Sequence, residues 1–175
     1  MEYKLINENN KVLYQKAAPW DFEKDGSPFE LIKEMTRMMF ENKGIGLAAP
    51  QLGVSKELFI MGNAELLIAC VNPTYIPVPD TKIVKEIEGC LSFPNLWLHV
   101  DRWESIQATY LDASGKEINA EFSGIQARCF QHETDHLRGE CFTSKVSKLS
   151  LDLAKKRQAK ELKKISKITA SVLRE

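Results

Sequence analysis

One predicted helix constrains this chain more than any other segment, because it carries a metal-binding pattern. Ser123 can cap its start, with Gln126 three residues later, and Gly139 follows its end. These signals predict a helix from about Gly124 to Arg138. Within it, His132-Glu133-Thr134-Asp135-His136 places two imidazoles four residues apart, so both rings project from one face of the helix. The sequence therefore predicts a helix that binds one tetrahedral metal.

The residue types in this pattern also indicate what the metal does. Two neutral imidazoles hold the metal, a bound water loses its proton near neutral pH, and the Glu133 carboxylate shuttles that proton. The alternative is a helix with surface histidines, but the chain has only three histidines, so coincidence is a poor explanation. A catalytic metal needs a third protein ligand and an open position for water.

The third ligand is sought among the cysteines and the remaining histidine. Cys90 lies in Glu88-Gly89-Cys90-Leu91-Ser92, where a strand runs into a glycine turn that can aim a thiolate at the helix. Cys70 sits in an apolar run and is expected in the core. Cys129 is one turn before the motif and would line the wall of the site. His99 is expected to be a strand residue, half-buried or at the surface. Cys90 is the best third ligand.

The rest of the chain alternates between helical and strand signals. Ser27-Pro28-Phe29-Glu30 predicts a helix start, with Ser as the cap, Pro in the first helical position and Glu completing a capping box. An apolar stripe follows at Phe29, Ile32, Met35, Met39 and Phe40. Predicted strands are Leu58–Met61, Leu66–Val71, Thr81–Ile87 and Trp97–His99, followed by a hairpin whose strands contain Ile106–Tyr110 and Ile118–Phe122.

The C-terminal segment differs from the rest in charge. Residues 1–144 carry 14 basic and 21 acidic residues, whereas residues 145–175 carry 10 basic and 3 acidic ones. Neither Gly nor Pro interrupts residues 149–172, which predict a helix that packs through apolar positions. These positions are Leu162, Ile165, Ile168 and Val172, and the basic residues include Lys155, Lys156, Arg157, Lys160, Lys163, Lys164 and Lys167. A solvated basic face is one interpretation, and contact with an RNA-rich surface is the other.

The expected fold is α+β, with mainly antiparallel sheets around the central metal-binding helix, an N-terminal helix and a basic C-terminal helix. We expect one catalytic domain over residues 1–147 and a basic helical tail over residues 148–175. The longest apolar run, Leu66–Val71, is too short for a membrane span. The N-terminus lacks the pattern of a secretory signal, so a cytoplasmic protein with free thiols is expected.

Three segments together resemble the signature motifs of peptide deformylases in order and spacing. They are Gly44–Gln51, Glu88–Ser92 and Gln131–His136, and the match covers roughly residues 28–143. The resemblance implies removal of the formyl group from the N-terminal formylmethionine of nascent polypeptides, in an α+β fold with one divalent metal. Ferrous iron is the expected native metal, with zinc, nickel or cobalt as substitutes. It also implies ribosome contact through the basic C-terminal helix, as in some members, and no membrane.

The resemblance further implies roles for single residues. The metal ligands would be Cys90, His132 and His136, with Glu133 as general base and acid. Gln51 and the backbone N–H of Leu91 would stabilise the oxyanion. The expected substrate-binding residues are Gly44, Ile45, Gly46, Glu88, Arg102, Ile125 and Cys129.

Two residues depart from the family pattern. Arg128 stands one turn before His132, where an apolar residue is usual, and a buried charge there is costly unless it is paired. Glu86 sits near the expected entrance to the site. We expect these residues either to pair with each other or to lean into solvent, with a loss of strict methionine preference if Arg128 intrudes on the pocket.

Two alternative functions remain at this point. A zincin-type metallopeptidase would take its third ligand downstream of the helix, and Glu161 is the candidate there. A non-catalytic binding module would use a structural metal, but such sites usually have four protein ligands and do not need Glu133. Replacing Cys90 separates the first alternative from the deformylase arrangement.

Overall fold

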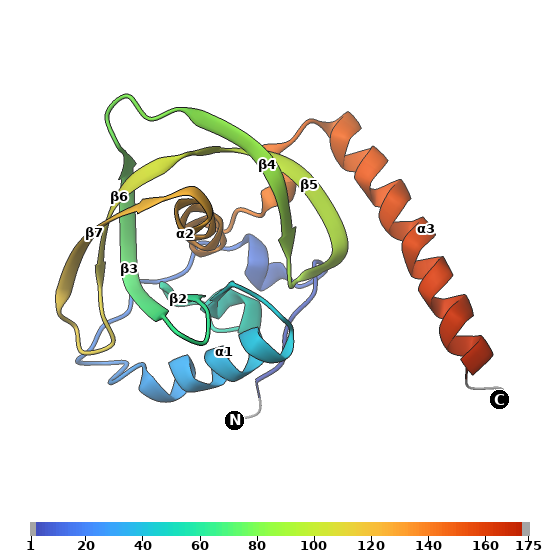
Figure 1. The fold of residues 1–175 in the computed structure, drawn as a ribbon. Coiled ribbons are helices and arrows are strands. Elements are labelled where there is room, and N and C mark those ends of the chain that lie inside the picture. The colour runs from blue at the N-terminus through green and yellow to red at the C-terminus, as the bar shows by residue number, and fades with distance from the viewer. Residues whose placement is uncertain (1–2, 173–175) are drawn as a thin grey trace.

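The protein is built around one central helix, α2 (Gly124–Leu137), which lies between two antiparallel sheets (Figure 1). The computed structural model describes residues 3–172, with side chains described for residues 3–166. Its α+β architecture confirms the predicted fold class. The predicted helix ends within one residue of α2, where Gly139 takes the left-handed conformation at φ 73°. The predicted side-chain cap is not formed, because the Ser123 side chain makes no hydrogen bond to the first turn.

The larger sheet has five strands, all antiparallel, in the order β1-β2-β3-β6-β7. The predicted hairpin forms β6 and β7, which pair from Ser105 with Ser123 to Leu111 with Glu117. The strand bounds are β1 Gly46–Ala48, β2 Leu58–Gly62, β3 Leu67–Pro77, β6 Ser105–Leu111 and β7 Glu117–Ser123. Phe130 of α2 packs against this sheet, with its ring centroid 5.0 Å from that of Phe59.

The smaller sheet is a hairpin of β4 (Ile83–Cys90) and β5 (Phe93–Trp103). The predicted strand Trp97–His99 is much shorter than β5. Alternate residues of β5 face inward, and Arg102 occupies one of these inward positions after Leu98 and Val100. Because arginine is usually a surface residue, the sequence alone does not show that Arg102 continues the inward-facing positions of β5.

The N-terminal helix α1 (Phe29–Glu41) lies against the β1 and β2 end of the larger sheet (Figure 1). Ile32, Met35 and Met39 are buried as predicted, whereas Phe29 and Phe40 are 62% and 40% exposed. The predicted capping box is not formed. Pro28 is itself the capping residue and has no side-chain oxygen to accept a hydrogen bond.

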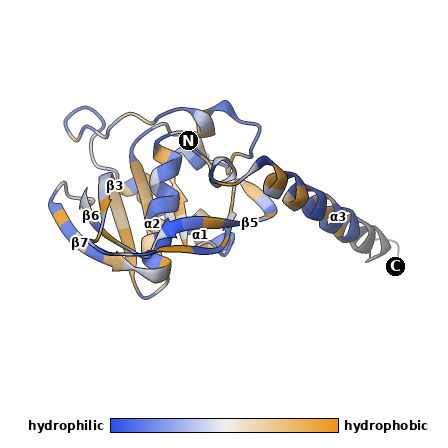
Figure 2. Ribbon diagram, turned by 90° about the horizontal axis from the view of Figure 1, so that it is seen from above, coloured by the Kyte–Doolittle hydropathy of each residue, from blue (hydrophilic) through white to orange (hydrophobic). Residues whose placement is uncertain are grey.

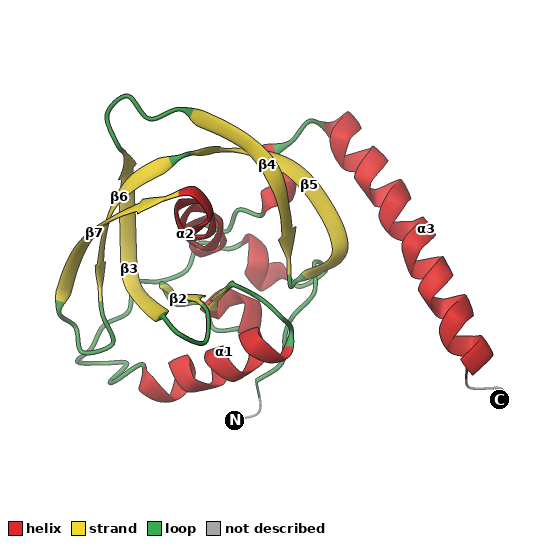
Figure 3. Ribbon diagram, in the orientation of Figure 1, coloured by secondary structure: helices red, strands yellow, loops and turns green. Residues whose placement is uncertain are grey.

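The last helix, α3 (Lys148–Val172), projects away from the body, as Figures 1 and 3 show. Its first turns pack against the body: Ala154 is buried in a cluster with Leu13 and Phe142, and the Gln158 side chain donates to the carbonyl of Pro94 at 2.8 Å. Other elements connecting the core are the 3₁₀ turns η1 (Lys11–Tyr14), η2 (Ala49–Leu52) and η3 (Phe142–Lys145). None of the described helices has the length and hydrophobicity required to span a membrane.

The predicted packing of the second half of α3 is wrong where it is described. Leu162 and Ile165 are 43% and 47% exposed, because this half extends past the edge of β5 and lies beyond the body (Figure 2). The side chains of Lys167, Ile168 and Val172 lie outside the described residues.

Two truncations test how far α3 belongs to the fold. Ending the chain after Lys160 keeps the described contacts of α3 with the body, so we expect an unchanged melting temperature. Ending it after Val146 removes Leu151 and Ala154 from the core cluster. We expect this removal to cost about 2 kcal/mol and to lower the melting temperature by roughly 4–8 °C. Thermal unfolding of the full chain and of the two truncated chains is followed by circular dichroism. Equal melting temperatures of all three would mean that α3 does not contribute to the stability of the fold.

Candidate metal centre

The three predicted metal ligands converge although they come from two separate elements. Cys90 ends β4, while His132 and His136 lie one turn apart on α2. Their ligand atoms all lie within 4.8 Å of one another, and the Cys90 sulfur is 3.2 Å from Nε2 of His136. Both histidines are buried, whereas Cys90 is partly accessible.

These residues fit a divalent metal on the chemistry of their donors. One thiolate and two imidazoles form a soft ligand set that suits iron or zinc better than magnesium or calcium. Among the described residues, Oε2 of Glu133 and Nδ1 of His136 are buried without a hydrogen-bond partner. Burial raises the pKa of Glu133 to about 7. A carboxyl group that titrates near neutral pH can both take up and release a proton there.

The Glu88 carboxylate lies directly behind His132. Its Oε2 is 3.0 Å from Nδ1 of His132, so Nδ1 carries the proton and Nε2 is left for a metal. Arg102 donates to both carboxylate oxygens, through Nε at 2.9 Å and Nη2 at 3.0 Å. Burial alone would raise the pKa of Glu88, but the hydrogen bonds from His132 and Arg102 outweigh it and lower the pKa to about 2. Glu88 therefore stays ionised.

This arrangement corrects the expected contact of Glu88 and Arg102 with substrate. Both residues are buried, and the remaining Arg102 donor group forms an ion pair with Asp135. They lie behind His132 because alternate residues of β4 and β5 face α2. Sequence reasoning missed Asp135, although a charged residue between the two motif histidines was a signal that a buried partner exists.

The segment Gly44–Gly46 lies against α2 on the side of Glu133. A Cβ atom added to Gly46 would lie 2.4 Å from Oε1 of Glu133 and 2.6 Å from the sulfur of Cys129. The Cys129 thiol donates to the carbonyl of Ile45 at 3.5 Å. Only glycine allows this close approach. β1 is also an edge strand, so among the described residues no other strand lies on its side away from β2.

Two of the expected pocket residues lie at an open surface. Ile45 is 52% exposed and Ile125 is 61% exposed, whereas Cys129 of α2 is buried. Gly44 is close to the turn after β4, since a Cβ added there would lie 2.9 Å from Cδ1 of Leu91. These side chains can therefore line a surface next to the metal ligands.

Gln51 is held in a fixed orientation beside Cys90. Its Oε1 accepts from the backbone N–H of Ala48 at 2.9 Å, and its Nε2 donates to the Cys90 sulfur at 3.4 Å and to Oγ of Ser92 at 3.3 Å. Gln51 is 1% exposed. Sequence reasoning assigned no role to Ser92, which orients this amide from the turn that follows Cys90.

Of the two placements expected for Arg128, pairing with Glu86 is the one found. The Arg128 side chain is buried, and its Nε donates to Oε2 of Glu86 at 3.1 Å. His99 is exposed on β5, Cys70 is in the core and Glu161 is exposed on α3. Among the described residues, the group that could hold a metal ion with His132 and His136 contains Cys90 and none of these three, which argues against the zincin alternative.

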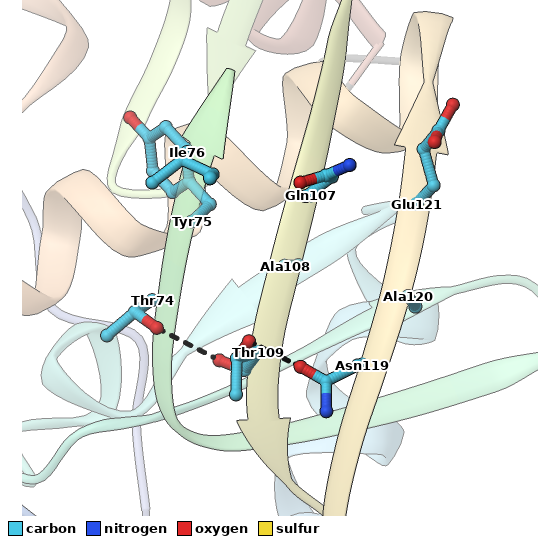
Figure 4. A pocket seen from close by; sticks show the side chains of 9 residues that line it. All are labelled: Thr74, Tyr75, Ile76, Gln107, Ala108, Thr109, Asn119, Ala120 and Glu121. Atoms are coloured by element: carbon cyan, nitrogen blue, oxygen red, sulfur yellow. Dashed lines mark hydrogen bonds between the residues drawn. The ribbon is translucent and has the colours of Figure 1, made fainter. Parts of the chain in front are cut away.

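A separate cavity of about 410 Å³ lies on the outer part of the larger sheet (Figure 4). Thr109 joins its strands by donating to Oδ1 of Asn119 at 2.7 Å and accepting at its carbonyl from Thr74 at 3.4 Å. The lining residues are Thr74, Tyr75, Ile76, Gln107, Ala108, Thr109, Asn119, Ala120 and Glu121. With no histidine or cysteine among them, this cavity does not offer the ligand set found around α2.

Replacing Cys90 by serine tests the ligand set directly. A serine hydroxyl is a harder and weaker ligand for zinc than a thiolate, so we expect Cys90→Ser to lose most of its zinc in a competition with a chelator. Cys141→Ser is the matched control, because Cys141 is a buried free thiol outside the ligand set. Equal zinc retention by the two variants, measured by metal analysis, would exclude Cys90 as a ligand.

Comparison with known proteins agrees with this geometry. The family model described as polypeptide deformylase matches residues 2–152. The peptide deformylase of Fusobacterium nucleatum is 35% identical over 177 residues, covering 100% of this chain and 99% of that protein. The peptide deformylase of Rhizobium meliloti is 38% identical over 164 residues, covering 91% and 93% of the two chains.

Solved structures show the same relationship in three dimensions. A peptide deformylase from Synechococcus elongatus, in complex with actinonin, superposes with a TM-score of 0.83 at 32% identity, covering 90% of this chain and 86% of that one. A peptide deformylase from Legionella pneumophila also gives 0.83, at 31% identity over 95% and 98% of the two chains. On sequence, fold and ligand geometry together, this chain belongs to the peptide deformylase family.

Proposed function

We propose that Cys90, His132 and His136 hold the metal of this deformylase and that Glu133 moves the protons of the reaction. Members of the family are metal-dependent hydrolases that remove the formyl group from nascent polypeptides. The observation that carries the assignment is the convergence of the three ligand atoms within 4.8 Å, next to a buried Glu133 oxygen without a partner. Ferrous iron is the proposed native metal, with zinc, nickel or cobalt able to replace it.

The chemistry follows from where these residues lie. When bound, the metal supplies a Lewis acid and lowers the pKa of a water molecule. Glu133 takes a proton from the attacking water and returns it to the leaving amine, so that water and the formamide become formate and a free N-terminus. The Gln51 amide and the Leu91 N–H donate to the formyl oxygen as negative charge develops on it. The fixed orientation of Gln51 beside Cys90 supports this role.

The proposed substrate is the N-formylmethionyl end of a nascent peptide, bound as an added strand along Gly44–Gly46. The free edge of β1 supports this, because main-chain hydrogen bonds at an edge strand accept many different sequences. Ile45, Ile125 and Cys129 would contact the methionine side chain. We further propose a cytoplasmic location, because the proposed substrate is the end of a nascent polypeptide.

We also propose that α3 contacts the ribosome. Its projecting half carries exposed Lys160, Lys163 and Lys164 and extends away from the body (Figures 1 and 2). Lysines on a free helix can bind RNA phosphates, and such binding weakens with salt.

Formate release from formyl-Met-Ala-Ser tests the activity, and Glu133→Gln tests the mechanism. We expect this variant to retain its metal and to lose roughly 10²–10⁴-fold in kcat, because the amide cannot accept the proton. Glu121→Gln, at an exposed position of β7, is the control and should remain fully active. Metal content is measured beside turnover, and normal turnover of a metal-loaded Glu133→Gln would remove Glu133 from its role.

Replacing Lys160, Lys163 and Lys164 together by glutamine tests the ribosome contact. We expect unchanged formate release from the short peptide and weaker cosedimentation with ribosomes. The logarithm of the binding constant should fall less steeply with the logarithm of salt concentration, by a slope of about 1 for each phosphate that a lysine no longer neutralises. The matched control replaces Lys33, Lys82 and Lys116, which are exposed elsewhere on the protein. If both triple variants cosediment equally, α3 is only a solvated basic helix.

A further inference from the structure

Arg128 is a buried cation to which neither the ligand set nor the proposed reaction assigns a task. It is 5% exposed, and four hydrogen bonds hold its guanidinium. Nη1 donates to Oε1 of Glu88 at 2.7 Å and to the carbonyl of Val100 at 2.9 Å. Nη2 donates to the carbonyl of Val84 at 2.6 Å, and Nε donates to Glu86 at 3.1 Å.

These contacts tie α2 to both strands of the smaller sheet. Val84 and Glu86 lie on β4, while Val100 lies opposite Glu86 on β5. The proposed ligands also come from these two parts, since Cys90 ends β4 of the hairpin and the two histidines lie on α2. The distance between the cysteine sulfur and the imidazoles therefore depends on how the β4–β5 hairpin docks on the helix.

Arg128 also acts on the carboxylate behind His132. It donates to Oε1 of Glu88, while His132 donates to Oε2 of the same group. Arg102, on β5, donates to both oxygens of the same carboxylate. A buried carboxylate held by two arginines has little freedom to rotate, and outer partners of this kind orient the ligand that they contact.

We infer that Arg128 is a positioning residue for the metal centre. By holding Glu88 and the β4–β5 hairpin against α2, it sets the placement of His132 relative to Cys90. The inference rests on the proposed metal centre and extends it to a residue outside the ligand set. Its contacts with Glu88 and with the Val100 carbonyl are buried and the one with the Val84 carbonyl is partly buried, whereas the Glu86 side chain is 56% exposed. The Glu86 pair therefore contributes little.

The test uses the full chain loaded with zinc and measures zinc release to a chelator. Arg128→Met keeps an unbranched side chain but removes all donors, and we expect its zinc affinity to fall by roughly 10–100-fold. Glu86→Gln should change zinc release by less than about fivefold, because only an exposed ion pair is weakened. Ile106→Ala on β6 is the matched control, since it destabilises the core and removes none of the hydrogen bonds of Arg128 or Glu88.

Two further measurements separate positioning from general stability. In the cobalt-loaded protein, the visible absorption bands report ligand geometry, so Arg128→Met should shift them and Ile106→Ala should not. Arg128→Lys serves if the methionine variant fails to fold. Lysine keeps the charge but lacks the planar guanidinium that reaches these four acceptors. We therefore expect the zinc release of Arg128→Lys to lie between that of the wild type and that of Arg128→Met.

The outcomes are distinct from those of the activity tests. Wild-type zinc release and a wild-type cobalt spectrum in the Arg128 variants would overturn the inference. It would also be overturned if Arg128→Met and Ile106→Ala lowered the melting temperature equally and lowered the zinc affinity equally. Failure of the wild-type chain to bind zinc overturns it together with the metal centre. If the wild type binds zinc but releases no formate, only the proposed function fails.

Discussion

The ion-pair network centred on Glu88 is the interaction on which the rest of the site depends. One buried carboxylate meets an imidazole and two guanidinium groups, which come from α2 and β5. Removing any one partner would leave a buried charge uncompensated, and such changes are usually far more costly than breaking an exposed pair. The network thus makes the docking of the smaller sheet on α2 inseparable from the placement of the ligand His132.

The central helix can carry so many polar groups because its two sides meet different surroundings. Phe130 packs into the larger sheet, where rings from several strands surround it, including Phe59, Tyr75 and Phe122. On the other side, Arg128, His132 and Asp135 find partners on the smaller sheet or beside it. A buried polar face is stable only when its groups are hydrogen-bonded, and here almost all of them are. The described exceptions are Oε2 of Glu133 and Nδ1 of His136, which belong to the proposed proton carrier and to one of the proposed ligands.

The open side of the site is formed by backbone as much as by side chains. Gly46 lets β1 approach Glu133 and Cys129 more closely than any other residue would allow. The same strand is the edge of its sheet, so the reactive groups lie beside a strand that has a strand neighbour on one side only among the described residues. A rigid helix, a fixed turn after Cys90 and a free strand edge together explain how one site can combine fixed chemistry with broad tolerance of peptide sequence, as the proposed function requires.

The sequence by itself determined the elements whose signals are local. The spacing of His132 and His136 and the glycine that ends α2 are local signals, and the hairpin of β6 and β7 depends on simple alternation. Only the tertiary structure decided the partners of the buried charges. Arg102 meets Glu88 across 14 positions and Arg128 meets Glu86 across 42, distances over which no periodicity carries information. The exposed half of α3 was equally beyond the sequence, because an apolar position is buried only where another surface exists to cover it.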